Sequence, residues 1–396
     1  MTDTVKEPAR DSASQERRTR YFGRFLLLVL WIGAIEVSSF VILNVLQSRY
    51  RTLVYDSSYI QVADVTSRGG YDARLGWIPK GDLDEHGARV DTSGHSYATA
   101  CVEMYGDSFT WSDEVQGRHA WPNDLSGFLG CRVLNFGVGG YGSDQALLRY
   151  LGNQRHADIA VLNHLSENIM RNANQLRNLI YPGKQLALKP RFVLEKGTLK
   201  YVSVPEVDVN QLDQAATRLV HEFFVPDGKS GIRSEFTFPY TYTLLGMATG
   251  HYRISARLRG EPAHARFYDA DHPAGGLELT SRIVGRFVAE ARAKGQIPLI
   301  TIIPMCKDLK FAEIHGVLPH QSLVQSLKDQ GIEVFDFSAA FRERADFESL
   351  YIDCRGHLNK AGYRFMATTF ARYLEQKGLV PKAQQSAAYP VSSPVR

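Results

Sequence analysis

Cysteine and clustered basic charge are both scarce in this sequence, and each shortage excludes a class of function. The four cysteines lie far apart and form no Cys-x-x-Cys pair, so a zinc knuckle or a thioredoxin-like redox site finds no support. Lys and Arg are spread along the chain, with a formal net charge of only +4, whereas a nucleic-acid binder carries gathered basic residues. We therefore expect no nucleic-acid partner, no metal and no cofactor.

The composition is that of a globular protein. Hydrophobic residues make up 44% of the 396 positions and aromatic residues 11%, which is enough to bury one large core or two modest ones. No internal repeat or long low-complexity tract interrupts the chain.

One long apolar run lies near the N-terminus. Residues 25–47, FLLLVLWIGAIEVSSFVILNVLQ, are long enough to cross a bilayer core of about 30 Å as a helix. The flank at 17–24 carries four arginines, Arg17, Arg18, Arg20 and Arg24, whereas Arg49 and Arg51 follow the run. This bias favours a cytoplasmic tail at 1–24 and an extracytoplasmic chain after the span. A cleaved signal peptide is the alternative, but the run is longer than a normal signal core.

Glu36 lies in the middle of this predicted span. An ionised acid at that depth costs about 3 kcal/mol, so the side chain is expected to be protonated, paired or turned toward a partner helix. A tolerated single acid in a strong span is the other interpretation.

From about residue 101 the chain alternates short apolar runs with helical patterns, which indicates βαβ units and a parallel sheet. Five strands suffice for a flavodoxin-like, three-layer α/β domain. The expected strands are 101–106, 132–137, 159–165, 297–304 and 332–337, and the expected helices are 119–129, 143–152, 277–294, 319–330 and 360–375.

The remaining segments flank or interrupt this domain, which we place at 101–376. Residues 48–100 link the span to the first strand, and about 175–275 break the alternation as an insertion over the site. Residues 377–396 are rich in small residues and proline and predict a disordered tail.

Three strand ends carry residues of catalytic type. YGDSFTW at 105–111 follows the first strand, VLNFGVGGYGSDQ at 133–145 contains the second, and VLNHLSENIMRN at 161–172 contains the third. In open α/β sheets ligands bind at the carboxyl ends of the strands. Gly-Asp-Ser alone is a weak signal, and the order of the blocks strengthens it.

In this order the chain resembles the SGNH (GDSL-type) hydrolases, in particular membrane-anchored polysaccharide O-acetyl esterases and acetyltransferases. The resemblance spans about 101–375 and places the family's functional residues at Ser108, Gly140, Asn168, Asp353 and His357. It implies a serine nucleophile with a histidine base and an aspartate that orients the histidine. It also implies an oxyanion hole formed by the backbone N–H groups of Ser108 and Gly140 and the side-chain amide of Asn168.

Two blocks depart from the family pattern. The third block is usually Gly-x-Asn-Asp, whereas Ser166-Glu167-Asn168-Ile169 keeps only the amide, and Asn168 could instead be a helix cap. In YIDCRGHLNKAGY, Asp353 precedes His357 by four residues rather than three. A Ser–His dyad with a backbone carbonyl orienting the ring is therefore an alternative to the full triad.

Other residues near these blocks have competing interpretations. His164 at the end of the third strand is a rival base, although a strand-end histidine more often satisfies a local carbonyl or packs in a pocket wall. Trp111, Trp121 and Tyr141 could line an acyl or sugar pocket, with core packing as the alternative for each.

The resemblance and the predicted anchor together predict an extracytoplasmic esterase or acyltransferase that acts on acyl esters, in particular acetyl esters, of cell-envelope glycans. A lipase or lysophospholipase is the alternative within the enzyme class. A catalytically silent glycan-binding module of an envelope assembly complex is the alternative outside it. Expected partners are an acylated glycan or other ester, the membrane and, in the last case, assembly proteins.

An oxidising extracytoplasmic space favours paired cysteines. Cys101 opens the first strand and Cys131 precedes the second, and neighbouring parallel strands are close enough at their starts for a disulfide. Cys306 and Cys354 are both expected at the opposite, active-site edge. The predicted pairs are Cys101–Cys131 and Cys306–Cys354, against the alternative of four small buried residues that never meet.

Overall fold

The structure is a computed structural model, and it describes residues 10–49, 71–79, 81–181, 186–206, 236–250, 252–354 and 356–379. The predicted disordered tail lies outside the described residues from 380 onward. Much of the predicted linker, at 50–70, and part of the predicted insertion, at 182–185 and 207–235, also lie outside them.

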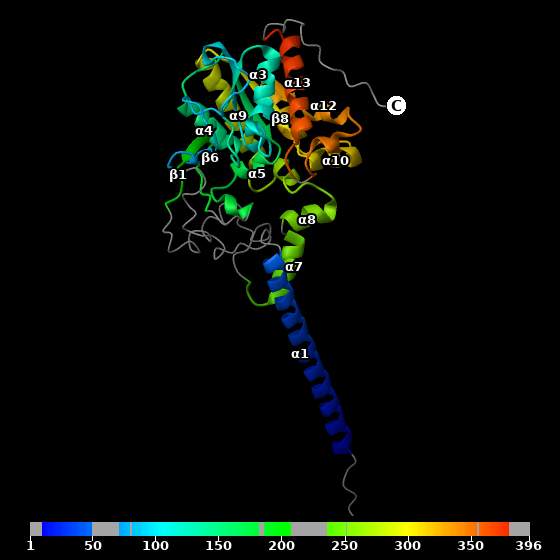
Figure 1. Ribbon diagram of the computed structural model, residues 1–396. Coiled ribbons are helices and arrows are strands. Elements are labelled where there is room, and N and C mark those ends of the chain that lie inside the picture. The colour runs from blue at the N-terminus through cyan, green and yellow to red at the C-terminus, as the bar shows by residue number, and fades with distance from the viewer. Residues whose placement is uncertain are drawn as a thin grey trace, which may run out of the picture.

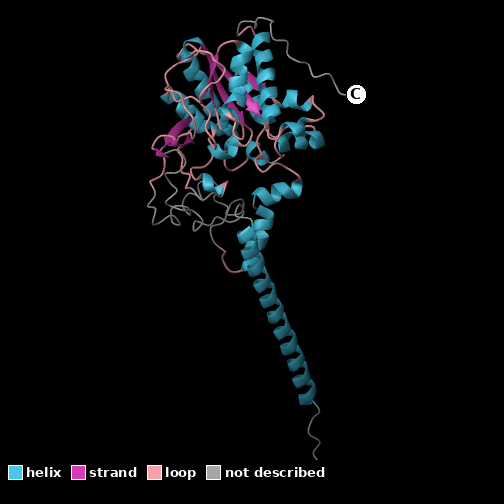
Figure 2. Ribbon diagram, in the orientation of Figure 1, coloured by secondary structure: helices cyan, strands magenta, loops and turns pink. Residues whose placement is uncertain are grey.

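A five-stranded sheet forms the centre of the α/β domain (Figures 1 and 2). All neighbouring strands in this sheet are parallel. The first of its five strands along the chain lies between the second and the third, as in flavodoxin-like sheets. In spatial order the strands are β4 (Arg132–Asn135), β3 (Ala100–Tyr105), β5 (Ile159–Leu165), β8 (Ile297–Ile303) and β9 (Val334–Asp336).

Alternation along the strands divides the core into two layers of side chains. In β8, Ile300 and Ile302 join the core on one face, while Leu299 and Ile303 join the core on the other. The first face is covered by α4 (Ser143–Gly152), α9 (Gly276–Ala293) and α11 (Gln321–Asp329). The second is covered by α3 (Trp121–Leu129), α10 (Cys306–His315), α12 (Ser338–Arg342) and α13 (Lys360–Gln376).

Smaller elements surround this sandwich. Two antiparallel pairs, β1 (Tyr71–Asp72) with β2 (Gly76–Trp77) and β6 (Arg191–Glu195) with β7 (Thr198–Val202), lie beside it. Short helices α2 (Ser108–Trp111) and α5 (Asn168–Asn172) follow β3 and β5 at the carboxyl edge of the sheet. The 3-10 helices are Tyr97–Thr99, Gly117–His119, Arg177–Leu179, Ala265–Tyr268 and Phe347–Leu350.

The N-terminal helix α1 (Arg10–Arg49) extends away from the α/β domain (Figure 1). Its segment Arg17–Arg49 is long and apolar enough to span a membrane, and little of it is buried. The helix begins at Arg10, so part of the predicted cytoplasmic tail continues the same helix. Within the predicted insertion lie two helices that the sequence did not predict, α7 (Tyr240–Gly250) and α8 (Tyr252–Arg259).

Candidate active site

Ser108 is placed by the turn that ends β3. The Asp107 carboxylate accepts a hydrogen bond from the Phe109 N–H (2.9 Å) and so caps α2, in which Ser108 is the first residue. Gly106 makes this turn possible, because a Cβ there would lie 2.0 Å from Thr110 Oγ1. The hydroxyl of Ser108 therefore lies just beyond the carboxyl end of β3, where the sequence predicted it.

His357 reaches Ser108 from the other end of the chain. Its Nε2 lies 2.9 Å from Ser108 Oγ, a hydrogen-bonding distance. The loop that carries it is held by a bridge between Tyr351 and Leu358 and by the Asn359 cap of α13. The two predicted partners, separated by 249 positions, are thus brought together.

The carboxylate beside the other ring nitrogen is an unexpected one. Among the described residues, the acid within ion-pairing distance of His357 Nδ1 is Glu114, whose Oε1 lies 3.7 Å away. Asp353 lies on the His357 loop, with its Oδ1 3.2 Å from the position that a Cβ on Gly356 would take. The role of Asp353 as the orienting acid stays a prediction, and Glu114 is a second candidate for that role, which the sequence analysis did not consider.

Two further carboxylates make this corner strongly acidic. Burial raises the pKa of Asp107, and the charge of Arg171 opposes that rise. Burial likewise raises the pKa of Asp113, and positive charge on His357 acts in the opposite direction. Three carboxyl groups, those of Asp107, Asp113 and Glu114, therefore lie near the His357 ring.

Arg171 is a buried residue that connects the segments following β3, β4 and β5. Its guanidinium pairs with Asp107 (3.1 Å) and Glu167 (3.2 Å) and donates to the Tyr141 carbonyl (3.0 Å). The sequence analysis missed this buried residue. Its position four residues after Glu167 on a helical pattern was the available signal, since such pairs face each other.

The predicted oxyanion residues differ in their access to substrate. Gly140 lines the cleft with Ser108 and has a φ of +82°, which favours glycine. Asn168 is fully buried, and its Oδ1 accepts from Arg171 Nη1 (3.0 Å). Its Nδ2 makes no hydrogen bond of normal geometry to the described residues, although it lies beside Asp107. The part of Asn168 in an oxyanion hole therefore stays a prediction.

A cleft of about 560 Å³ opens over Ser108 and His357. Of the three aromatic residues predicted for such a pocket, Trp111 lines it. Trp121 is instead buried against Phe337 and Phe370 in the core. Tyr141 is buried and donates its hydroxyl to the Trp77 carbonyl (2.5 Å). The other aromatic and basic lining residues include Trp77, Phe109, Tyr181, Arg171 and Arg177.

His164 does not lie beside Ser108. It is fully buried behind the sheet edge, where its ring nitrogens contact Ser143 Oγ (2.8 Å) and Tyr268 Oη (2.9 Å). Burial lowers the pKa of His164 to about 3, and so the ring is neutral at physiological pH. This packing role is the alternative that the sequence analysis preferred for it.

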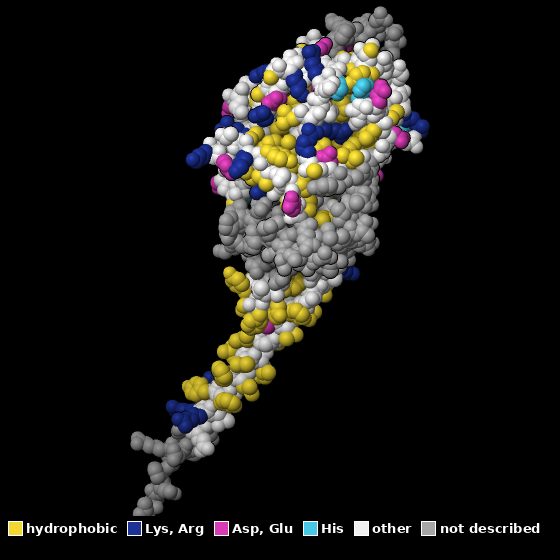
Figure 3. Space-filling view, turned by 90° about the vertical axis from the view of Figure 1, so that its left-hand side faces the viewer, with side chains coloured by type: hydrophobic (Ala, Val, Ile, Leu, Met, Phe, Trp, Pro, Cys, Tyr) yellow, Lys and Arg dark blue, Asp and Glu magenta, His cyan; other side chains and the backbone are white. Residues whose placement is uncertain are grey.

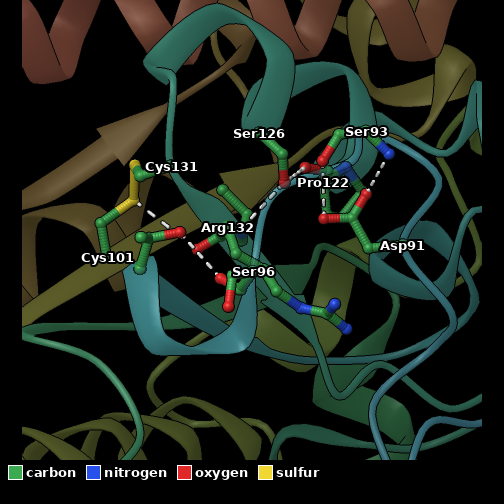
Figure 4. Close-up of a disulfide and its surroundings, with 10 residues drawn as sticks. Asp91, Ser93, Ser96, Cys101, Pro122, Ser126, Cys131 and Arg132 are labelled. Carbon is green, nitrogen blue, oxygen red and sulfur yellow. Dashed lines mark hydrogen bonds between the residues drawn. A yellow bond between two sulfur atoms is a disulfide. The ribbon is translucent and has the colours of Figure 1, made fainter.

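Two disulfides are present, and they are the predicted pairs. Cys101 and Cys131 join the starts of β3 and β4 with their Cα atoms 5.9 Å apart (Figure 4). Cys306 and Cys354 have Cα atoms 5.0 Å apart and tie the start of α10 to the His357 loop. Cys306, Cys354 and Glu348 form the group of potential metal ligands found among the described residues, but the disulfide removes both thiolates.

Comparisons with known proteins add little. No protein-family model and no curated protein matches this sequence. A solved structure from Desulfitobacterium hafniense DCB-2, described as a lipolytic protein of the G-D-S-L family, is similar with a TM-score of 0.33 and 13% identity, over 69% of this chain and 98% of that one. A member of the lipolytic protein G-D-S-L family from Veillonella parvula DSM 2008 gives a TM-score of 0.35 and 10% identity, over 70% and 99%. Likenesses this distant do not establish a function.

Proposed function

We propose that the protein is a serine esterase or acyltransferase in which Ser108 is the nucleophile and His357 the base. The observation that carries this proposal is the 2.9 Å contact between His357 Nε2 and Ser108 Oγ at the floor of an open cleft. A serine hydroxyl is a weak nucleophile until a neighbouring imidazole accepts its proton.

The reaction would proceed in two steps, acylation of Ser108 and then deacylation. His357 takes the hydroxyl proton as Ser108 Oγ attacks the ester carbonyl, and the same proton passes to the leaving alcohol as the acyl-serine forms. Water or a sugar hydroxyl then gives its proton to His357 and attacks the acyl carbon. His357 passes that proton to Ser108 Oγ as the bond between the acyl carbon and Oγ breaks, which restores the serine hydroxyl and yields the acid or a new ester. Whether the outcome is hydrolysis or transfer depends on which of these two nucleophiles reaches the acyl-enzyme.

The charged groups around the cleft suit these two reaction steps. Asp113 and Glu114 would stabilise the imidazolium that forms when His357 accepts the proton. Backbone N–H groups at Ser108 and Gly140 are the proposed donors to the oxyanion, and each such donor is worth about 3 to 4 kcal/mol in the transition state.

We propose acyl esters of cell-envelope glycans as the substrate. An apolar N-terminal helix and two disulfides support an anchored domain outside the cytoplasm. The cleft combines the flat rings of Trp77, Trp111 and Tyr181 with polar groups, a lining that suits a sugar ring.

The test is release of p-nitrophenol from esters of increasing acyl length, with and without a glycan acceptor. We expect turnover of the acetyl ester, redirection of the acetyl group to the acceptor, and loss of both in Ser108→Ala, with the fold unchanged because the hydroxyl leaves no cavity. A preference for long chains would instead indicate a lipase. Ser108→Ala with activity within twofold of wild type would overturn the mechanism.

A further inference from the structure

We propose that residues 236–250 form a re-entrant segment, embedded in the bilayer beside α1, and that Glu36 is the residue that holds this segment in place. The occupant of the exposed apolar face of α7 is then the hydrocarbon of the bilayer. The inference rests on the proposed membrane anchoring by α1, and it assigns a purpose to Glu36, which the proposed catalytic function leaves unexplained.

Glu36 lies at the depth where an acid is least tolerated. It is the only Asp, Glu, Lys or Arg between Arg24 and Arg49. At 1.5 Å per residue it is about 18 Å along the helix from the first and about 20 Å from the second. An acid near the middle of a bilayer requires a partner.

The partner is the N-terminus of α7. The Glu36 carboxylate accepts hydrogen bonds from the backbone N–H of Tyr240 (2.6 Å) and of Thr241 (3.4 Å). The first N–H groups of a helix have no intrahelical acceptor, and hydrocarbon offers none. A carboxylate at the positive end of the helix is also electrostatically favourable. The acid therefore gains hydrogen-bond donors and the N-terminus of α7 gains an acceptor. Each contact lowers the free-energy cost of placing the other group in the membrane.

The contact continues along one stripe of α1. Ser39 Oγ lies 3.0 Å from Thr241 Oγ1, and the rings of Phe40 and Tyr240 have centroids 4.9 Å apart. Further along, Leu43 and Met247 are buried in a shared cluster. Positions 36, 39, 40 and 43 share one face of α1. The contacts advance along both helices together, from Glu36 with Tyr240 to Leu43 with Met247, so α7 runs alongside α1 in the same direction (Figure 1).

The face of α7 turned away from α1 is apolar. On α7, Tyr242 and Leu245 are 65% and 59% exposed, and Phe238, just before the helix, is 72% exposed. Residues 236–250 contain no Asp, Glu, Lys, Arg or His. This face continues the exposed hydrophobic surface of α1, to which Val37 contributes at 64% exposure (Figure 3). A contiguous apolar surface of this kind marks an interaction site, and its continuity with the proposed membrane span identifies lipid as the partner.

The next helix fits the level of the lipid headgroups. α8 follows directly and carries the exposed Arg257 and Arg259, of which Arg259 pairs with Glu261 (2.7 Å). Its third arginine, Arg253, donates to the Ile180 carbonyl (2.7 Å), and in Figure 1 α8 lies between α7 and the α/β domain. Basic side chains at this level suit an anionic headgroup layer. The side of the domain that faces α8 is the one where α5 and α10 begin, which is the carboxyl edge of the sheet (Figure 1). The segment would thus hold this edge close to the membrane.

Spin labelling of the full-length protein in lipid nanodiscs tests the insertion. A nitroxide would be attached at Leu245→Cys, at Val37→Cys as the membrane reference, and at Ile297→Cys, a 42% exposed position at the start of β8 and so at the opposite edge of the sheet, as the aqueous reference. We expect the Leu245 label to match the Val37 label, with high accessibility to oxygen and low accessibility to a polar nickel complex. A Leu245 label that behaves like the Ile297 label, while the Val37 label remains in lipid, would overturn the insertion. If the Val37 label is itself aqueous, the anchor has failed as well.

The role of Glu36 is tested in the labelled Leu245→Cys protein. Glu36→Ala leaves the α7 N–H groups without an acceptor, so we expect at least a threefold rise in accessibility of the label to the nickel complex. Glu36→Gln keeps an acceptor oxygen and should remain close to the parent. An unchanged profile in Glu36→Ala would overturn the role of Glu36 as the holding residue.

Discussion

Single residues decide how closely this site follows a serine, histidine and acid mechanism. The block order in the sequence located Ser108 and His357, because both lie at turns directly beside regular elements. It did not locate Glu114 or Arg171, since their contacts depend on how loops fold back over the sheet edge. Local sequence carries little information about such contacts.

The orienting acid can be identified by two conservative substitutions. Glu114 is largely exposed and its contact is long, so Glu114→Gln should lower kcat by no more than about fivefold. If Asp353 completes the triad in the working enzyme, Asp353→Asn should lower kcat by about 10³-fold or more, as expected when the histidine loses its tautomer-fixing carboxylate. Steady-state kinetics with an acetyl ester distinguishes them. The reverse ranking would assign the triad position to Glu114, and two small losses would indicate a dyad.

Asn168 tests the oxyanion hole. Its Nδ2 is a buried donor without a normal hydrogen bond among the described residues, which suits a group reserved for a transition state. Asn168→Ala should lower kcat by about 10²- to 10³-fold with little change in KM. Thermal unfolding of the same variant controls for the lost contact with Arg171. A rise in KM alone would assign the amide to ground-state binding.

At the scale of elements, periodicity predicted the regions that alternate strictly. Strands β3, β5 and β8 and helices α4, α9 and α13 lie within a few residues of their predicted ranges, because each has a continuous apolar face against the sheet. Within the described part of the predicted insertion, β6 and β7 are extended strands, whereas α7 and α8 are helices that the sequence did not predict. Helix α7 was missed because it is apolar without amphipathic periodicity, and its partner, α1, is far away in sequence.

The Cys306–Cys354 disulfide should matter for the placement of His357. It fastens the loop that carries the base to the start of α10. Replacing both cysteines by serine should lower kcat/KM by about tenfold or more at temperatures where the protein remains folded, because a loosened base loses its alignment with Ser108. The same replacement of Cys101 and Cys131, at the opposite edge of the sheet, is the matched control and should leave kcat/KM within about twofold. Equal effects of the two replacements would show that the second disulfide acts on stability alone.

At the scale of the whole molecule, a long apolar helix, a segment docked on it and an α/β domain form one chain (Figure 1). The sequence predicted the span from its length and flanking arginines, and it posed the question of Glu36 without answering it. The answer required tertiary structure, since Glu36 and Tyr240 are separated by 204 positions. The central claim for the molecule remains chemical, namely that Ser108 is an activated nucleophile.

Labelling of the folded, full-length protein with a fluorophosphonate probe tests that claim most directly. The probe forms a covalent bond only with a serine whose hydroxyl is activated by its surroundings. Mass spectrometry of the labelled peptides should find one adduct, on Ser108, which disappears in Ser108→Ala and falls at least a hundredfold in rate in His357→Ala. Folded wild-type protein that acquires no adduct on Ser108 would contradict the account and favour a catalytically silent binding module.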